Sequence, residues 1–189
     1  MVGTWWPYVA DGYQVPTGVE DFPRPGPPPV FIGFGSMAAG QGERLSALVV
    51  EALRRAEVRG VVQAGWAGIA GEGDDVLSVG ELPHARLLPR MAAVVHHAGT
   101  AVAALRAGVP SVPVPVTADQ PFWADRLARL GAATAPLRFA DLTADRLAEA
   151  IRQAVVEQRL RERAQKVARA VAMEDGAGQV AEAVAALGR

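Results

Sequence analysis

Residues 94–123, VVHHAGTAVAALRAGVPSVPVPVTADQPFW, constrain the fold of this chain more than any other stretch. An apolar strand ends at Val95, a polar turn follows, and the alanine-rich residues 101–107 predict a short helix. A glycine and a proline then stop the helix before residues 112–116, which predict a second apolar strand. A strand followed at once by a helix and another strand is typical of parallel sheets.

The rest of the chain alternates in the same way. Apolar runs predict further strands at residues 30–34, 59–64, 76–79 and 132–135. Helical periodicity predicts helices near residues 42–55, 84–91, 121–130, 143–155, 160–171 and 180–187. Thr143 is a good N-cap for the fourth of these helices. The predicted fold class is therefore α/β, a doubly wound parallel sheet with helices on both faces.

Residues 1–29 have a different character, because prolines and glycines interrupt them and no periodicity is visible. A loop of this length is unusual inside a compact domain. We interpret residues 1–29 as a linker-like segment, with Trp5 and Trp6 packing on a neighbour, and residues 30–189 as one domain.

The polar turn between the two strands of the central stretch has a chemical consequence. A helix that begins directly after a strand offers unpaired backbone N–H groups and a partial positive charge, which suit a phosphate. Asp119 and Gln120 follow the next strand, and their side chains can hydrogen-bond to hydroxyl groups. One end of this unit therefore suits a phosphate and the other a sugar.

Several of these residues also have simpler interpretations. A pair such as His96 and His97 most often supplies one core histidine and one helix cap. The Thr100 hydroxyl could accept from the backbone of residue 103, as an N-cap does, instead of from a ligand. Asp119 could likewise cap the helix that begins near Pro121.

The aromatic residues and the third histidine are also ambiguous. Buried packing is the favoured interpretation of Trp66, although an aromatic ring after a strand could line a cleft. Packing is likewise favoured over sugar stacking for Phe122 and Trp123. For His84, a surface position at a helix start and a place in a binding site are equally favoured.

The central stretch resembles the donor-binding signature of GT-B glycosyltransferases that act on small molecules. These include the glycopeptide (vancomycin-class), macrolide and sterol glycosyltransferases and, more distantly, the plant UDP-glycosyltransferases. The matching residues, in order, are His96-His97, Ala98-Gly99-Thr100, Arg106-Ala107-Gly108-Val109-Pro110, Pro115 and Ala118-Asp119-Gln120-Pro121-Phe122-Trp123. Two glycines that the family pattern has after the second histidine are missing here.

The resemblance implies one Rossmann-like half of a GT-B fold, the half that binds a UDP- or TDP-sugar. It implies diphosphate contacts from Ser36, His97, Ala98, Gly99 and Thr100. It further implies nucleobase contacts near Leu82 and His84, and sugar contacts from Asp119 and Gln120. The family works without a required metal or other cofactor, and the sequence contains no Asp-x-Asp motif.

The resemblance places the catalytic base in an N-terminal acceptor domain, so no catalytic residue is expected on this chain. We expect the chain alone to transfer no sugar and to need that domain as its partner. The implied whole enzyme is an inverting hexosyltransferase with a natural-product or sterol-like acceptor. The alternatives are a degenerate, non-catalytic donor domain with an auxiliary or structural role, which the missing glycines favour, and a sugar-nucleotide epimerase on the same scaffold.

Composition excludes several other functions. The chain has no cysteine, which rules out disulfides and thiol catalysis, and its net charge of −1 gives no electrostatic case for nucleic acid. No apolar run is long enough for a membrane span, and nothing resembles a signal peptide, so a cytoplasmic location is expected. Apolar surface that would face the other domain could make the isolated chain self-associate.

Overall fold

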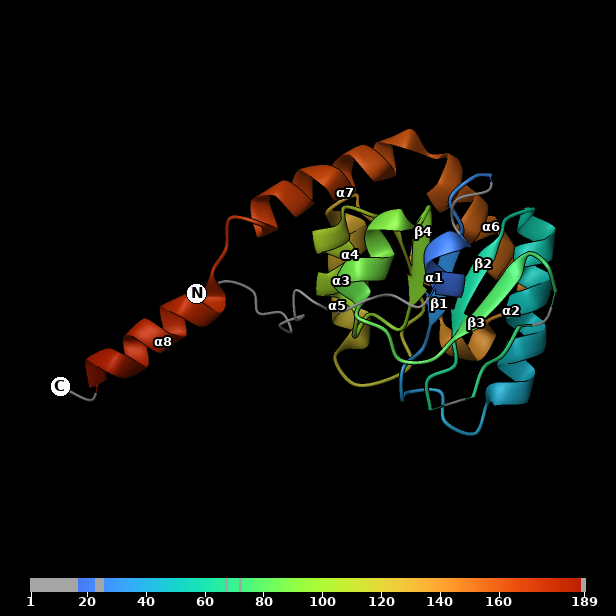
Figure 1. Ribbon diagram of the computed structural model, residues 1–189, viewed down its shortest axis with the longest axis horizontal. Helices are drawn as coiled ribbons and strands as arrows, with labels where there is room; N and C mark the ends of the chain where they lie inside the picture. The colour runs from blue at the N-terminus through green and yellow to red at the C-terminus, as the bar shows by residue number, and fades with distance from the viewer. Residues whose placement is uncertain (1–16, 23–25, 67, 72, 188–189) are drawn as a thin grey trace.

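The computed structural model describes residues 17–22, 26–66, 68–71 and 73–187 (Figure 1). Its centre is a five-stranded sheet in the order β3-β2-β1-β4-β5, and all four neighbouring pairs are parallel. The strands are β1 Val30–Gly33, β2 Gly60–Gln63, β3 Val76–Val79, β4 Ala93–His96 and β5 Ser111–Pro113. The predicted α/β fold with a doubly wound parallel sheet is confirmed.

Helices cover both faces of this sheet (Figure 1). On one face, α2 (Gly42–Ala56) and α6 (Ala144–Val156) bury their apolar sides against alternate strand residues such as Ile32 and Val95. On the other face, the smaller core contains Phe31, Val61 and Val94 together with residues of three short helices. These helices are α1 (Thr17–Asp21), α3 (His84–Leu87) and α4 (Ala101–Ala107).

The remaining helices extend this framework. The chain continues from β5 into α5 (Gln120–Arg129), and two 3₁₀ turns lie at Leu88–Arg90 and Phe139–Asp141. Helix α7 (Gln158–Val171) packs against α4, whereas α8 (Gly176–Leu187) leads away from the sheet (Figure 1). The last turns of α8 are exposed, including the apolar Val184 and Leu187. None of the helices in the described ranges has both the length and the apolar content that crossing a bilayer requires.

Two predicted strands differ from the structure by more than one residue at an end. Strand β5 ends at Pro113 instead of residue 116, because its partner β4 ends at His96. The Val114 N–H still donates to the His96 carbonyl at 2.8 Å, but the Val116 N–H donates to Oε1 of Gln120 instead. The strand predicted at residues 132–135 is wrong: this segment makes only an isolated parallel bridge between Ser111 and Ala133. Its backbone turns away at once, and the Leu137 N–H donates to the Pro113 carbonyl.

The segment interpreted as a linker contains one element that periodicity did not reveal. Helix α1 packs Val19 onto the second core, where only 7% of that residue is exposed. Trp5 and Trp6 lie outside the described residues, so their predicted packing and the boundary at residue 30 stay predictions. The Thr143 N-cap is confirmed, because its hydroxyl oxygen accepts from the Arg146 N–H at 3.3 Å.

Candidate functional site

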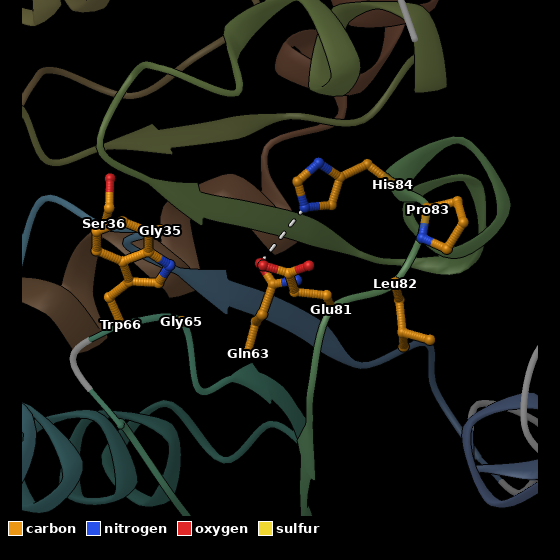
Figure 2. Close-up of a pocket in the computed structure, with 9 residues that line it drawn as sticks. All are labelled: Gly35, Ser36, Gln63, Gly65, Trp66, Glu81, Leu82, Pro83 and His84. Carbon is orange, nitrogen blue, oxygen red and sulfur yellow. Dashed lines mark hydrogen bonds between the residues drawn. The ribbon is translucent and has the colours of Figure 1, made fainter. Parts of the chain in front are cut away.

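A cavity of about 560 Å³ lies where β1, β2 and β3 end (Figure 2). The end of each strand, or the loop after it, contributes residues to the wall of the cavity. These are Gly35 and Ser36 at β1, Gln63, Gly65 and Trp66 at β2, and Glu81, Leu82, Pro83 and His84 at β3. The carboxyl ends of parallel strands gather ligand-binding groups at one edge of a sheet. The structure therefore brings together Ser36, Leu82 and His84, three residues singled out from the sequence.

Two glycines hold the first two of these loops against each other. Both Gly35 and Gly65 have left-handed backbones, with φ of 56° and 55°. The Trp66 N–H donates to the Gly35 carbonyl at 3.2 Å. A methyl group on Gly65 would lie 2.5 Å from that same carbonyl oxygen, so no side chain fits there. The shape of the cavity depends on this contact.

Buried packing for Trp66 is wrong, because 77% of the residue is exposed. The tight backbone contact at Gly65 fixes the main chain of Trp66 and places its ring at the Ser36 end of the cavity (Figure 2). An exposed aromatic ring at the mouth of a cavity offers a flat apolar surface to a ligand.

His84 combines the two positions that the sequence left open. It is the first residue of α3, yet its ring is half-buried and lines the cavity. The ring meets Phe31 edge to face at a centroid distance of 5.6 Å, and its Nε2 lies 3.4 Å from Oε1 of Gln63 (Figure 2). Burial, and to a smaller extent His97, lowers the pKa of His84, so the ring is neutral at pH 7 and Nε2 donates to Gln63.

The histidine pair after β4 divides into two roles. His96 is completely buried, and its Nδ1 accepts the Ala98 N–H at 3.0 Å, so the proton of the neutral ring sits on Nε2. Burial, with smaller contributions from His97 and His84, lowers the pKa of His96 to about 3. His96 is thus the core histidine of the pair, and it fixes the turn that follows.

His97 faces the switch point of the sheet, between β1 and β4. A methyl group on Gly35 would lie 3.1 Å from its Cε1, and one on Gly99 would lie 2.2 Å from its Nε2. The ring therefore lies between two glycines and joins the turn after β4 to the loop that carries Ser36. Burial lowers the pKa of His97, and the Gly33 backbone opposes this shift in part, so the ring is neutral at pH 7.

Ala98 has an unusual backbone for a residue with a side chain, with φ of 72°. Its N–H already donates to His96, which leaves one fewer amide for a phosphate in this turn. The simpler interpretation of Thr100 is not supported: it occupies the N-cap of α4, but within the described residues its hydroxyl makes no capping hydrogen bond. Thr100 and the exposed Gly99 therefore keep free polar groups beside His97.

We expect Ala98→Gly to raise the free energy of unfolding by about 0.5 kcal/mol. Relief of left-handed strain, about 1–2 kcal/mol, outweighs the greater flexibility of glycine in the unfolded chain. Ala47→Gly, in the exposed interior of α2, is the control and should cost about 1 kcal/mol. Urea unfolding of both variants measures this, and an equal loss in the two would show that Ala98 is unstrained.

Asp119 and Gln120 lie at the same sheet edge, beyond β5, but they do not line the cavity. Asp119 does not cap α5: its Oδ2 instead accepts from the Trp123 indole Nε1 at 2.8 Å. The Gln120 residue is buried, and its Oε1 accepts from the backbone N–H groups of Val116 and Thr117. These bonds shape the loop after β5.

The two aromatic residues of α5 pack mainly on each other. Their rings meet edge to face at a centroid distance of 5.1 Å, and both residues stay exposed, Phe122 at 64% and Trp123 at 45%. The expected packing is therefore mutual and lies at the surface, not in a core.

Sequence reasoning did not assign Gln63, Glu81 or Pro83 to a site, although all three line the cavity. A signal was available, because each residue stands at or just after the carboxyl end of a predicted strand. Single strand ends are common, however, and only the sheet order places these three side by side.

Comparison with known proteins gives one family match. Residues 62–187 match the family described as the erythromycin biosynthesis protein CIII-like, C-terminal domain. Among curated relatives, a sterol 3-beta-glucosyltransferase of Arabidopsis thaliana is 35% identical over 181 residues, which cover 93% of this chain and 28% of that protein. The O-mycaminosyltylonolide 6-deoxyallosyltransferase of Streptomyces fradiae is 39% identical over 91% of this chain and 41% of its own length.

Solved structures agree with this match. The glycosyltransferase VinC, crystallised in complex with DTDP, is 27% identical with a TM-score of 0.72, over 90% of this chain and 44% of VinC. The glycosyltransferase SnogD of Streptomyces nogalater is 26% identical with a TM-score of 0.71, over 97% of this chain and 49% of SnogD. This chain thus spans less than half the length of each of these relatives.

Proposed function

The chain belongs to the family of the erythromycin biosynthesis protein CIII-like C-terminal domain, a GT-B glycosyltransferase domain, and we propose that it binds the nucleotide-sugar donor of an inverting enzyme. That enzyme would move a hexose from a UDP- or TDP-sugar to a natural product or sterol-like acceptor. The observation that carries this proposal is the cavity at the carboxyl ends of β1 to β3, with His97 beside it on the loop of Gly35.

The two ends of the cavity suit the two ends of a nucleoside diphosphate. Leu82, Pro83 and His84 form an end with apolar surface and backbone polar groups, which suits a nucleobase. Ser36 lies at the other end, and its loop contacts the His97 ring. A crystal structure of the relative VinC contains DTDP, which supports a nucleotide as the ligand class.

His97 would act on the leaving group. As the bond between the sugar and the diphosphate breaks, negative charge grows on the departing phosphate oxygen. A hydrogen bond from the neutral His97 ring, with the Gly99 amide and the Thr100 hydroxyl, would stabilise that charge. We propose that no metal ion is required and that Asp119 and Gln120 together orient the sugar. The catalytic base, which takes the proton of the acceptor, would lie in the acceptor domain.

One observation favours the alternative of a degenerate donor domain. The Ala98 amide donates to His96 and is not available to a phosphate, and the turn lacks the two glycines of the family pattern. In that alternative the cavity would take no nucleotide, and the domain would serve as an auxiliary or structural partner. Titration with nucleotides distinguishes the two functions.

Calorimetric titration with UDP and with TDP is the test, with and without EDTA. We expect at least one nucleotide to bind with a dissociation constant below about 1 mM, and EDTA to leave that constant unchanged. His97→Ala should weaken binding of the nucleotide about tenfold, since a hydrogen bond to a charged group is lost, and leave binding of the nucleoside unchanged.

Thr143→Ala, which removes a helix cap at a residue that does not line the cavity, is the control and should leave both affinities as they are. Absence of binding of either nucleotide at millimolar concentration would favour the degenerate domain. If His97→Ala weakened the binding of nucleoside and of nucleotide equally, His97 would not contact the diphosphate.

A further inference from the structure

The middle of the cavity differs from its two ends. Figure 2 shows Leu82 and Pro83 toward one end, Ser36 and Trp66 toward the other, and the side chains of Gln63 and Glu81 between them. A nucleoside diphosphate has its pentose between the base and the phosphates. If the base and the diphosphate occupy the two ends, the pentose must lie beside Gln63 and Glu81.

The two middle side chains are not equally available. The amide of Gln63 is held on both sides, because its Nε2 donates to the Gly80 carbonyl at 3.3 Å and its Oε1 lies 3.4 Å from Nε2 of His84. Glu81 is exposed, and within the described part of the chain its carboxylate has neither a hydrogen-bond nor an ion-pair partner. Glu81 therefore supplies the free acceptor in the middle of the cavity.

The charge of Glu81 restricts what it can bind. An ionised carboxylate only accepts hydrogen bonds, and its two oxygens can take two neighbouring O–H groups at once. It would repel a phosphate group at the same place. Of the three parts of a nucleoside diphosphate, the one with neighbouring hydroxyls and no charge is the ribose, through its 2′- and 3′-hydroxyls.

We propose that Glu81 binds the ribose 2′- and 3′-hydroxyls and thereby selects ribonucleotide over 2′-deoxyribonucleotide donors, a uridine over a thymidine diphosphate sugar. This inference rests on the proposed function, since it places a nucleotide in the cavity. A 2′-deoxyribose offers one hydroxyl where the carboxylate can accept two, and the lost hydrogen bond weakens binding. The Gln63–His84 pair holds the adjoining wall and keeps the pentose facing Glu81.

The test compares UDP with 2′-deoxy-UDP by calorimetry, because these ligands differ by one hydroxyl. The wild-type chain should bind UDP about tenfold more tightly, the effect of one hydrogen bond to a charged group. Glu81→Ala should bring the ratio of the two dissociation constants close to one. Asp74→Ala removes the same charge from an exposed loop outside the cavity, and it should keep the tenfold ratio.

The outcomes separate the two proposals. Equal binding of UDP and 2′-deoxy-UDP by the wild-type chain would overturn the role of Glu81 and leave the donor-binding function in place. An unchanged ratio in Glu81→Ala would also overturn it. Uridine and 2′-deoxyuridine repeat the comparison without the diphosphate. Absence of binding by these four ligands and by TDP would overturn the donor-binding function as well.

Discussion

Replacing Gly65 with alanine should destabilise the fold by about 3 kcal/mol and remove nucleotide binding. A left-handed backbone costs a residue with a side chain about 1–2 kcal/mol. The new methyl group would also lie 2.5 Å from the Gly35 carbonyl oxygen, and forcing the two loops apart adds about 1–3 kcal/mol. The Trp66 hydrogen bond to that carbonyl would be lost at the same time.

Gly68→Ala is a matched control for this substitution. Gly68 lies in the same loop with φ of 66°, but no atom lies within 4 Å of the position that a methyl group would take. It should therefore show only the backbone cost of about 1 kcal/mol. Urea unfolding gives the two free energies, and titration with UDP gives the two affinities. Equal destabilisation by both substitutions would show that the contact with Gly35 is not tight.

Lowering the pH from about 6.5 to 5 should cost about 2 kcal/mol of stability through His96 alone. The pKa of His96 is about 3 in the folded chain, against 6.5 when exposed. Below pH 6.5 the unfolded chain takes up a proton at this residue that the folded chain does not. The contribution of His96 is therefore complete above pH 6.5 and is lost as the pH falls toward 3.

Comparison with His96→Asn isolates this effect from that of the acidic residues. Asparagine keeps an acceptor for the Ala98 N–H but does not titrate, so its free energy of unfolding should fall less steeply between pH 6.5 and 5. Proton NMR of the wild-type ring is a second measurement that does not need the variant to fold. A His96 signal that titrates near pH 6 would contradict the prediction.

The sheet could be predicted because buried parallel strands are nearly continuous apolar runs and glycines mark their ends. Strand β1 shows this well, since a strand is predicted at residues 30–34 and the observed strand Val30–Gly33 is buried throughout. The failure at residues 132–135 has a physical reason as well. Alanine and threonine are compatible with a strand, but the partner strand β5 ends at Pro113 and leaves little to pair with.

The candidate site was only partly predictable. The adjacent pair His96 and His97 predicted one core histidine, without saying which. Only the structure shows that His96 is the buried one and that His97 faces the loop of Gly35. Trp66 was expected in a core because large apolar side chains are usually buried. Its exposure follows from a backbone contact between two glycine turns, and the residue types do not reveal such a contact.

The sequence by itself determined the fold class, the family resemblance and the turn after β4, because these depend on local residue patterns: apolar runs, helix-stopping glycines and a short motif. Only the tertiary structure decided that Gln63, Glu81 and Trp66 share one cavity with Ser36 and His84. Three loops distant along the chain form that cavity, and they meet because the strand order sets β1, β2 and β3 side by side. Local patterns carry no information on that strand order. The order is fixed by the packing of helices on the two faces of the sheet.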